Sequence, residues 1–496
     1  MHTSQFGSEH GGIIAFDSEP ASAVQALIAP TSSTVARQIP PWPFQLSSGE
    51  SRVLDHYIQR FSRTYPTFSG PNNPFLRIFL PLSMQSRVVL DSLLALSAVQ
   101  SWENGSFAMG DAMLSFRQKA LRGCMTLLGN ITSGPSQFLL ESAGESQAGS
   151  TSQSGSEGSE QLATDDVLFL LSSCVLLLLY EKLAGEGQDN WTPHIQFFTR
   201  MFPGRLLTGT VNGTPVTELD STRTEAFQFL SNLFLYNDLV RSTTLQTATL
   251  SPFYLGKTAE AASASSASQA DRNTLRLLPL QDERFKFPRI IARLSMGDLT
   301  VTDAEIAAWD GRLDWFPSFA LVAAPERSHS VEPLPTADAA ALADPSFERL
   351  DSFTGVAAGW EDAALVSELY RVAAAIYRRQ CLVRYLKESG QPMTSDGASL
   401  EDLETGNLGL WAVQLIQLLP EGSMFENTLL WPIGISAKEL CSSRVAERDT
   451  VFHRLQSLER RFQMKHFASM REFLTKFWQA RDAGLDYRDN EPILFG

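Results

Sequence analysis

LLWPIGISAKE, residues 429–439, is the stretch that decides how this chain folds. A proline disfavours helical geometry at the residue before it and is well tolerated in the first turn of a helix. Trp431-Pro432 therefore predicts a buried aromatic side chain at a break between helices, and Gly434 allows close approach of a neighbouring element. The stretch indicates interlocked helices rather than a chemical centre.

Downstream of this stretch, an arginine-rich helical pattern continues to Trp478 and predicts a long basic helix. Its apolar positions recur mostly every three or four residues, as on one helix face; they are Val451, Leu455, Leu458, Phe462, Phe467, Met470, Leu474 and Phe477. From Cys441 to Arg481 there are nine basic residues against four acids. The pattern favours a solvated face with intramolecular partners, then a docking face for an acidic partner, and lastly direct DNA binding.

Upstream, apolar periodicity predicts a series of further helices. Residues 86–102 and an apolar stripe from Met113 to Leu127 lie on either side of a short turn, so they predict an antiparallel helical hairpin, whose second helix ends at Gly129-Asn130. Other helices are predicted from near Ser51 and over 191–207, 224–245, 360–386 and 408–418. Because no segment of useful length alternates with period two, the predicted fold class is all-α, a large multi-helix bundle or superhelical domain.

Composition divides the chain into a helical domain and polar segments. Residues 1–48 lack periodicity and are predicted to be disordered, the helical domain spans 49–482, and 483–496 form a tail. Three low-complexity inserts interrupt the domain, and they cover residues 133–163, 257–273 and 323–346.

The most apolar run is Val167 to Tyr180, with the sequence VLFLLSSCVLLLLY. As a helix it would be about 21 Å long, whereas the hydrocarbon core of a bilayer is about 30 Å thick. Asp165, Asp166 and Glu181 border it closely. We therefore predict a buried core helix and no membrane association.

Charge and cysteine content exclude several function classes. The formal net charge of −15 over 496 residues argues against a free-standing nucleic-acid binder. The four cysteines, Cys124, Cys174, Cys381 and Cys441, are dispersed, so they predict core fillers in a reducing compartment rather than disulfides or a metal site. A six-cysteine binuclear zinc cluster cannot be built from four dispersed cysteines.

Motifs of catalysis or nucleotide binding were not found, and no catalytic, cofactor or metal residue is predicted. His194, in WTPHIQFF, lacks a companion carboxylate or nucleophile at helical spacing and is interpreted as structural. Asp165-Asp166 and Asn237-Asp238 invite comparison with the magnesium-binding motifs of terpene cyclases. The second motif fails because Arg241 and Leu245 occupy the positions of its other ligands, so Asp165-Asp166 is better explained as helix N-terminal charge.

Several elements together resemble the fungal-specific transcription factor domain, the helical regulatory region that follows a zinc cluster in many fungal factors. The elements that carry the likeness are Leu93 to Ala98 (LLALSA), Phe116 to Leu128, Trp191 to His194 (WTPH), Phe234 to Asp238 (FLYND), and Leu430 to Ala437 with Arg448 and a helix to Trp478. The resemblance covers roughly residues 50 to 480.

The resemblance implies a nuclear, non-enzymatic transcription regulator that acts through protein contacts with the transcription machinery or a zinc-cluster factor. Homo- or heterodimerisation is a further expectation. For the helices around residues such as Phe227, Phe234 and Trp360, a packed core is the favoured interpretation, and a cavity for a small effector is the alternative. Direct DNA binding is not expected without the cluster. A helical co-regulator or scaffold that partners a zinc-cluster factor is the alternative, and an all-α enzyme of the terpene-cyclase type is the remote one.

Overall fold

The structure is a computed structural model that describes residues 43–66, 73–102, 108–133, 157–184, 191–201, 210–211, 214–215, 221–245, 247–250, 285–313, 315–316, 361–389 and 405–485. The chain divides into two compact units, Met1–Pro43 and Phe44–Gly496. Apart from Pro43, every described residue belongs to the second unit. The predicted segment 1–48 lies mostly outside the described residues, as do the inserts 257–273 and 323–346 and most of the tail 483–496.

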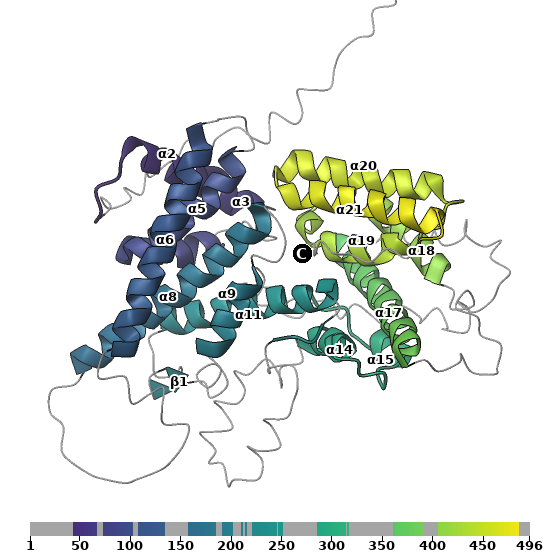
Figure 1. Cartoon of the computed structure of the whole chain (residues 1–496), viewed down its shortest axis with the longest axis horizontal. Helices are drawn as coiled ribbons and strands as arrows, with labels where there is room; N and C mark the ends of the chain where they lie inside the picture. The colour runs from purple at the N-terminus through teal and green to yellow at the C-terminus, as the bar shows by residue number, and fades with distance from the viewer. Residues whose placement is uncertain are drawn as a thin grey trace, which may run out of the picture. The chain divides into compact units, whose positions relative to one another are not determined.

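The second unit is all-α, as predicted (Figure 1). Its first part consists of short helices with two π-helical turns: α2 (Ser48–His56), the π-helix η2 (Tyr57–Phe61), α3 (Ser62–Thr64), the π-helix η3 (Phe75–Phe79) and α4 (Leu80–Gln85). Ser47 and Glu50 form a capping box that fixes the start of α2. Asn73 joins the two π-helical segments, because its amide donates to Ser62 O at 2.6 Å and its carbonyl accepts from Phe75 N at 2.9 Å.

Three long helices form the next layer: α5 (Arg87–Trp102), α6 (Ala108–Ser133) and α8 (Glu157–Ala184). Helices α5 and α6 form the predicted hairpin, although α6 continues past the expected end at Gly129-Asn130. Helix α8 begins at Glu157, inside the predicted insert 133–163, whose residues 134–156 lie outside the described part.

Two short elements follow this layer: α9 (Thr192–Met201) and a two-stranded antiparallel ribbon of β1 (Thr210–Val211) and β2 (Thr214–Pro215). They lead to the long helix α11 (Ser221–Leu245). Helix α9 is described as far as Met201, and the rest of the predicted helix, residues 202–207, lies outside the described residues. Helix α11 packs against both α8 and α14 and carries the FLYND element.

The C-terminal half is built around α17. Its elements are α14 (Lys286–Ser295), α15 (Asp303–Ala307), α17 (Asp362–Ser389), α18 (Thr405–Leu418), the 3-10 turn η9 (Glu426–Thr428), α19 (Leu430–Ser436) and the 3-10 turn η10 (Ala437–Glu439). Pro432 lies in the first turn of α19, so the prediction of a helix break at Trp431-Pro432 is confirmed.

The predicted single C-terminal helix is wrong. The segment forms a hairpin of α20 (Val445–Phe462) and α21 (Lys465–Asp482), which lie side by side (Figure 1). Gln463 ends α20 in the left-handed conformation, with φ of 54°, and Met464 is extended. The turn is anchored on the N-terminal helices, since Gln100 Nε2 donates to Phe462 O at 2.7 Å and Arg60 donates to Gln463 Oε1 at 2.6 Å.

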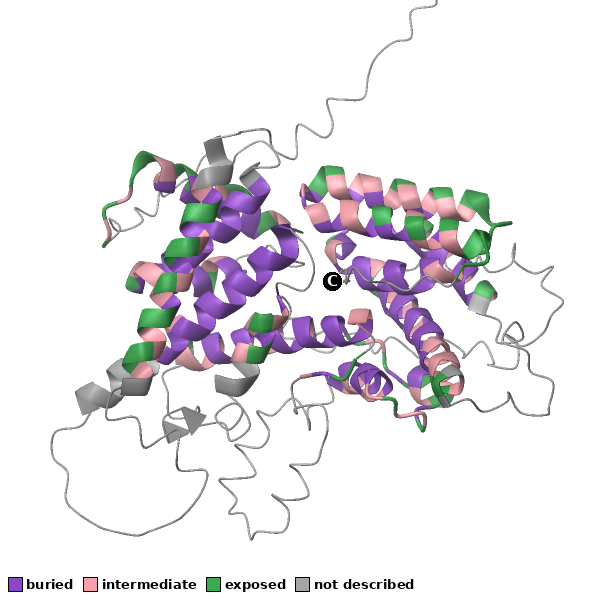
Figure 2. Ribbon diagram, viewed as in Figure 1, coloured by how far each residue is buried: buried purple, intermediate pink, exposed green. Residues whose placement is uncertain are grey.

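Burial separates core helices from surface helices. Helices α5 and α8 are buried on nearly every side of their described middle portions, whereas α20 and α21 show alternating buried and exposed stripes (Figure 2). The stretch Asp165–Ala184 is apolar and long enough to span a membrane, but 94% of its most apolar part is buried inside the fold. The run Val167 to Tyr180 is therefore a core helix, as predicted.

Candidate functional site

Trp431 belongs to an aromatic cluster with Tyr236, Phe287, Trp315 and Tyr370, which we call the aromatic core. Its ring stacks on Tyr370 at a centroid distance of 5.3 Å and meets the Phe287 ring edge-on at 6.2 Å. Its indole Nε1 donates to Thr243 Oγ1 at 2.9 Å. Because these partners come from α17, α14 and α11, Trp431 fastens α19 to three helices that are distant in sequence.

A small gap remains beside this tryptophan. The residues around it are Tyr236, Leu239, Val240, Phe287, Ile291, Trp315, Tyr370 and Trp431. It leaves about 10 Å³ for the centre of a water-sized molecule, which is room for about one water. In this conformation the aromatic core is packed and the gap is too small for an organic molecule.

The residues suggested for an effector cavity do not line this gap. Phe227 and Phe234 are buried in α11 and do not line the gap, while Trp360 lies outside the described residues. Of the FLYND element, only Tyr236 lines it. Phe287 and Trp315, which line the gap, were missed because nothing in their local sequence indicates that they lie beside it.

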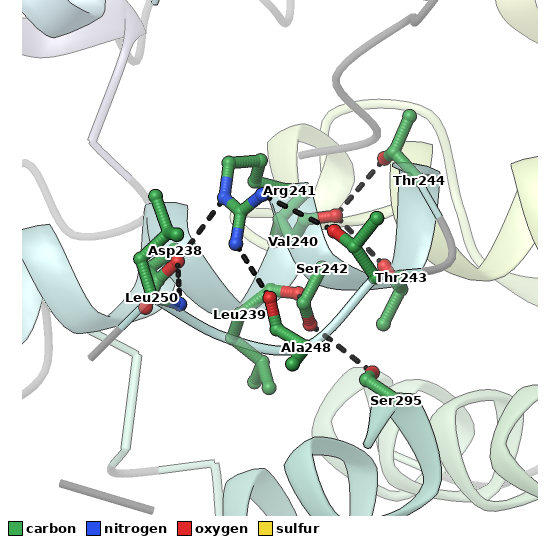
Figure 3. A network of polar contacts seen from close by, with 11 residues as sticks. Asp238, Leu239, Val240, Arg241, Ser242, Thr243, Thr244, Ala248, Leu250 and Ser295 are labelled. Carbon is green, nitrogen blue, oxygen red and sulfur yellow. Dashed lines mark hydrogen bonds and ion pairs between the residues drawn. The ribbon is translucent and has the colours of Figure 1, made fainter. Parts of the chain in front are cut away.

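Asp238 organises a buried polar network next to the aromatic core (Figure 3). Its Oδ1 accepts from Arg241 Nε at 3.2 Å and from Leu250 N at 3.1 Å. Arg241 also donates to Ala248 O at 2.7 Å. A buried carboxylate and a buried guanidinium thus satisfy each other and hold the chain that follows α11 against the helix.

A second arm of this network crosses to neighbouring helices. Ser242 Oγ and Ser295 Oγ lie 3.1 Å apart, and Ser295 Oγ is 3.0 Å from Tyr377 Oη. All three hydroxyls are buried, and burial raises the pKa of Tyr377. The arm therefore joins α11, α14 and α17 through polar contacts that complement the Trp431 contacts.

The aspartates that were compared with magnesium-binding motifs, Asp165 and Asp238, are each paired with an arginine. Arg223 grips Asp165 with two hydrogen bonds of 3.0 Å, and Asp238 is paired with Arg241. Within the described ranges, no group of three or more His, Cys, Asp or Glu residues is positioned to hold a metal. Both aspartates therefore act as partners of arginines that tie helices and turns together.

Lys182 is a buried amine on α8, and no ion pair joins it to a carboxylate of the described residues. Its Nζ lies 3.4 Å from Asn237 Oδ1 and 5.8 Å from the centre of the Tyr236 ring. Burial lowers the pKa of Lys182 to about 7. His466 of α21 faces the same region, and burial together with the charge of Lys182 lowers its pKa to about 3. A charge at this junction of α8, α11 and α21 is thus costly.

The WTPH element has a structural role. Trp191 is buried, and His194 Nε2 lies 4.0 Å from Glu181 Oε1, which is also paired with Arg117 at 2.6 Å. Burial, aided by the charge of Arg117, lowers the pKa of His194 to about 4. The interpretation of His194 as structural agrees with these contacts, which hold α9 and α6 to α8.

Arg448 connects both ends of the C-terminal hairpin to the stretch around Trp431. It donates to Leu440 O at 2.9 Å and forms two hydrogen bonds with Asp482, at 2.6 and 2.9 Å. Its guanidinium carbon lies 5.0 Å from the centre of the Trp478 ring, and Trp478 Nε1 donates to Ala437 O at 2.9 Å. Arg448 and Trp478 thus clamp α20 and α21 onto η10.

Most basic residues of the hairpin have partners within the protein, as the first interpretation predicted. Arg454 and Arg461 both contact buried Glu426, and Arg471 contacts Glu459. Arg444 and Lys476 pair with acids one turn away on their own helices. These pairings give no support to a docking face for an acidic partner or to DNA binding.

Comparison with known protein families gives a match that covers most of the chain. The family model described as the fungal specific transcription factor domain matches residues 52–290 and 327–490. No curated protein and no solved structure matches the chain. The two matched ranges include Trp431 with its partners Thr243, Phe287 and Tyr370, the Asp238–Arg241 pair and the C-terminal hairpin.

Proposed function

The chain belongs to the fungal-specific transcription factor domain family, and on that premise we propose that it is a regulatory domain that acts through protein contacts and without a zinc cluster of its own. A role in transcription regulation follows from the family. The observation that carries the proposal is the match over 52–290 and 327–490, which takes in nearly every described helix. We place its action in the nucleus.

The cysteines support the part of the proposal that concerns DNA. Cys124, Cys174 and Cys381 are buried on α6, α8 and α17, and Cys441 is exposed after η10. The four thiols of this chain are therefore too few for a six-cysteine binuclear cluster, and Cys381 and Cys441 lie on other elements than Cys124 and Cys174. We propose that sequence reading on DNA comes from a partner, a zinc-cluster factor, with the transcription machinery as a second contact.

The gap beside Trp431 is too small for an organic effector in this conformation. A drug-sized ligand occupies several hundred Å³, whereas the gap beside Trp431 has room for about one water. An effector would have to displace stacked aromatic side chains. A catalytic role on diphosphates is disfavoured because Asp165 and Asp238 are held by Arg223 and Arg241.

Fluorescence anisotropy with labelled duplex DNA tests the DNA part of the proposal. Purified full chain is titrated into a panel of duplexes at physiological salt, with a zinc-cluster protein on its own site as positive control. We expect no sequence-selective binding by the chain alone, because selective binding needs side chains placed in a groove. Tight, sequence-selective binding that survives chelation of zinc would overturn this part.

Co-expression with a zinc-cluster factor tests the partner part. We expect a complex that shifts the mobility of the factor's DNA site beyond the shift caused by the factor alone. A tagged copy of the chain should enter the nucleus in the same cells. Persistent exclusion from nuclei would contradict the proposed site of action.

A further inference from the structure

Helices α6 and α8 run antiparallel with a register that brings two cysteines together. Arg117 on α6 is paired with Glu181 on α8, with Nε and Oε1 2.6 Å apart. Seven residues, or two helical turns, separate Arg117 from Cys124, and seven separate Cys174 from Glu181. Two turns forward along α6 from Arg117 lies Cys124, and two turns back along α8 from Glu181 lies Cys174. In antiparallel helices these two positions are neighbours, and both cysteines belong to one cluster.

The two thiols occupy one buried cluster. Cys124 and Cys174 pack in the same buried cluster as Ala120, Leu170 and Leu177. Cys174 is 5% exposed, and Cys124, at 9%, lies nearer to the surface. The interaction between the two thiols lowers the pKa of Cys124 and raises that of Cys174. The pair thus consists of a more acidic outer thiol and a less acidic inner one.

We propose that Cys124 and Cys174 are a redox modification site that forms a reversible disulfide with hydrogen peroxide as oxidant. The disulfide would join α6 to α8 covalently beside the Arg117–Glu181 ion pair. This inference rests on the geometry of the two helices and does not depend on the role in transcription.

The reaction uses both thiols and balances with one peroxide. The Cys124 thiolate attacks one peroxide oxygen, the O–O bond breaks, and water leaves after protonation, which gives a sulfenic acid on Cys124. Cys174 sulfur then attacks Cys124 sulfur, the S–O bond breaks, and a second water leaves. Two thiols are oxidised to one disulfide while hydrogen peroxide is reduced to two waters.

Cys124 is the attacking thiol because access and acidity both favour it. Reactive cysteines have lowered pKa values, and of this pair Cys124 has the lowered pKa and is the more exposed. Cys381 is an inert control, because burial raises its pKa. Cys441 is exposed on a different part of the chain, so it must be removed before thiols are counted.

The test maps disulfides in the native full-length protein with the Cys441→Ser substitution. The folded protein is treated with hydrogen peroxide, free thiols are alkylated, and unreduced peptides are analysed by mass spectrometry. We expect a crosslinked peptide pair containing Cys124 and Cys174, loss of two of the three remaining thiols, and reversal by dithiothreitol. Cys381 should be alkylated only after denaturation.

Two further samples keep the result decisive. Cys174→Ser should trap Cys124 as sulfenic acid, detectable with dimedone, and should form no crosslink. If Cys174→Ser fails to fold, the Cys441→Ser protein, which keeps both Cys124 and Cys174, still shows whether the crosslink forms. The inference is overturned if both cysteines remain free thiols in folded, peroxide-treated protein, or if they react only after unfolding in urea.

Discussion

Trp431→Phe removes the indole N–H and should lower the free energy of unfolding by an amount that follows from one lost hydrogen bond. Trp431 is 3% exposed and its Nε1 donates to buried Thr243 Oγ1 at 2.9 Å. In Trp431→Phe, a ring still packs against Tyr370 and Phe287, but Thr243 loses its donor. Leaving one buried hydrogen-bond partner unsatisfied costs about 1–3 kcal/mol, so we expect that loss in the free energy of unfolding. Trp431→Ala also removes the ring and should cost about 3–5 kcal/mol.

A double-mutant cycle isolates the hydrogen bond. Thr243→Val removes the acceptor and leaves the indole N–H without a partner, which should also cost about 1–3 kcal/mol. The double variant Trp431→Phe with Thr243→Val removes both partners. We therefore expect its loss to be smaller than the sum of the single losses by about 1 kcal/mol.

Urea unfolding followed by circular dichroism measures all four proteins of the cycle. Trp411→Phe is the matched control, because Trp411 is only half-buried and its Nε1 lies 3.5 Å from Glu368 Oε1, a long contact. It should cost less than Trp431→Phe. Additive losses in the cycle, or a larger effect at Trp411, would refute the assignment of Trp431 as the residue that fastens α19 to α11.

Three further predictions concern other parts of the fold. Arg448→Ala should make the α20–α21 hairpin more sensitive to limited proteolysis than Arg448→Lys does, since lysine keeps the charge near Asp482 but cannot form the paired contacts; equal cleavage rates would contradict the clamp. Lys182→Met should raise the urea midpoint at pH 7 and flatten its pH dependence. Burial lowers the pKa of Lys182 in the folded protein from 10.5 to about 7, so the unfolded state binds more protons between these two pH values. The stability of the wild-type protein should therefore rise with pH from about 7 upward. A wild-type urea midpoint that falls over pH 7–9 would be inconsistent with a neutral buried amine. Gly123→Ala should lower the thermal midpoint, because its Cβ would lie 2.6 Å from Val88 Cγ2, and Val88→Ala should partly restore it; no loss in the single variant would show that α5 and α6 can separate.

Helix positions could be predicted because apolar periodicity records burial directly. The stripe from Met113 to Leu127 and the buried run from Val167 to Tyr180 both lie where expected. The C-terminal hairpin was missed because Gln463 and Met464 are neither glycine nor proline. A signal was present, however, since the interval from Phe462 to Phe467 is five residues and interrupts the spacing of three and four.

Contacts between distant segments could not be predicted from local pattern. Trp431 was recognised as a buried aromatic, but its partners Thr243, Phe287 and Tyr370 belong to other helices. The cysteines were interpreted individually as core fillers, which is wrong for the exposed Cys441. Only the packing of α6 against α8 shows that Cys124 and Cys174 share one cluster. The two π-helical turns have no sequence signal that we can identify.

A tethered reporter assay tests the central claim, that this helical domain regulates transcription, most directly. The full chain is fused to a heterologous DNA-binding domain in a fungal host, and reporter expression is compared with that of the DNA-binding domain alone. We predict a several-fold change in expression, which is lost in Trp431→Ala at equal protein level. An unchanged reporter, with the wild-type fusion folded, nuclear and bound at its site, would contradict the claim.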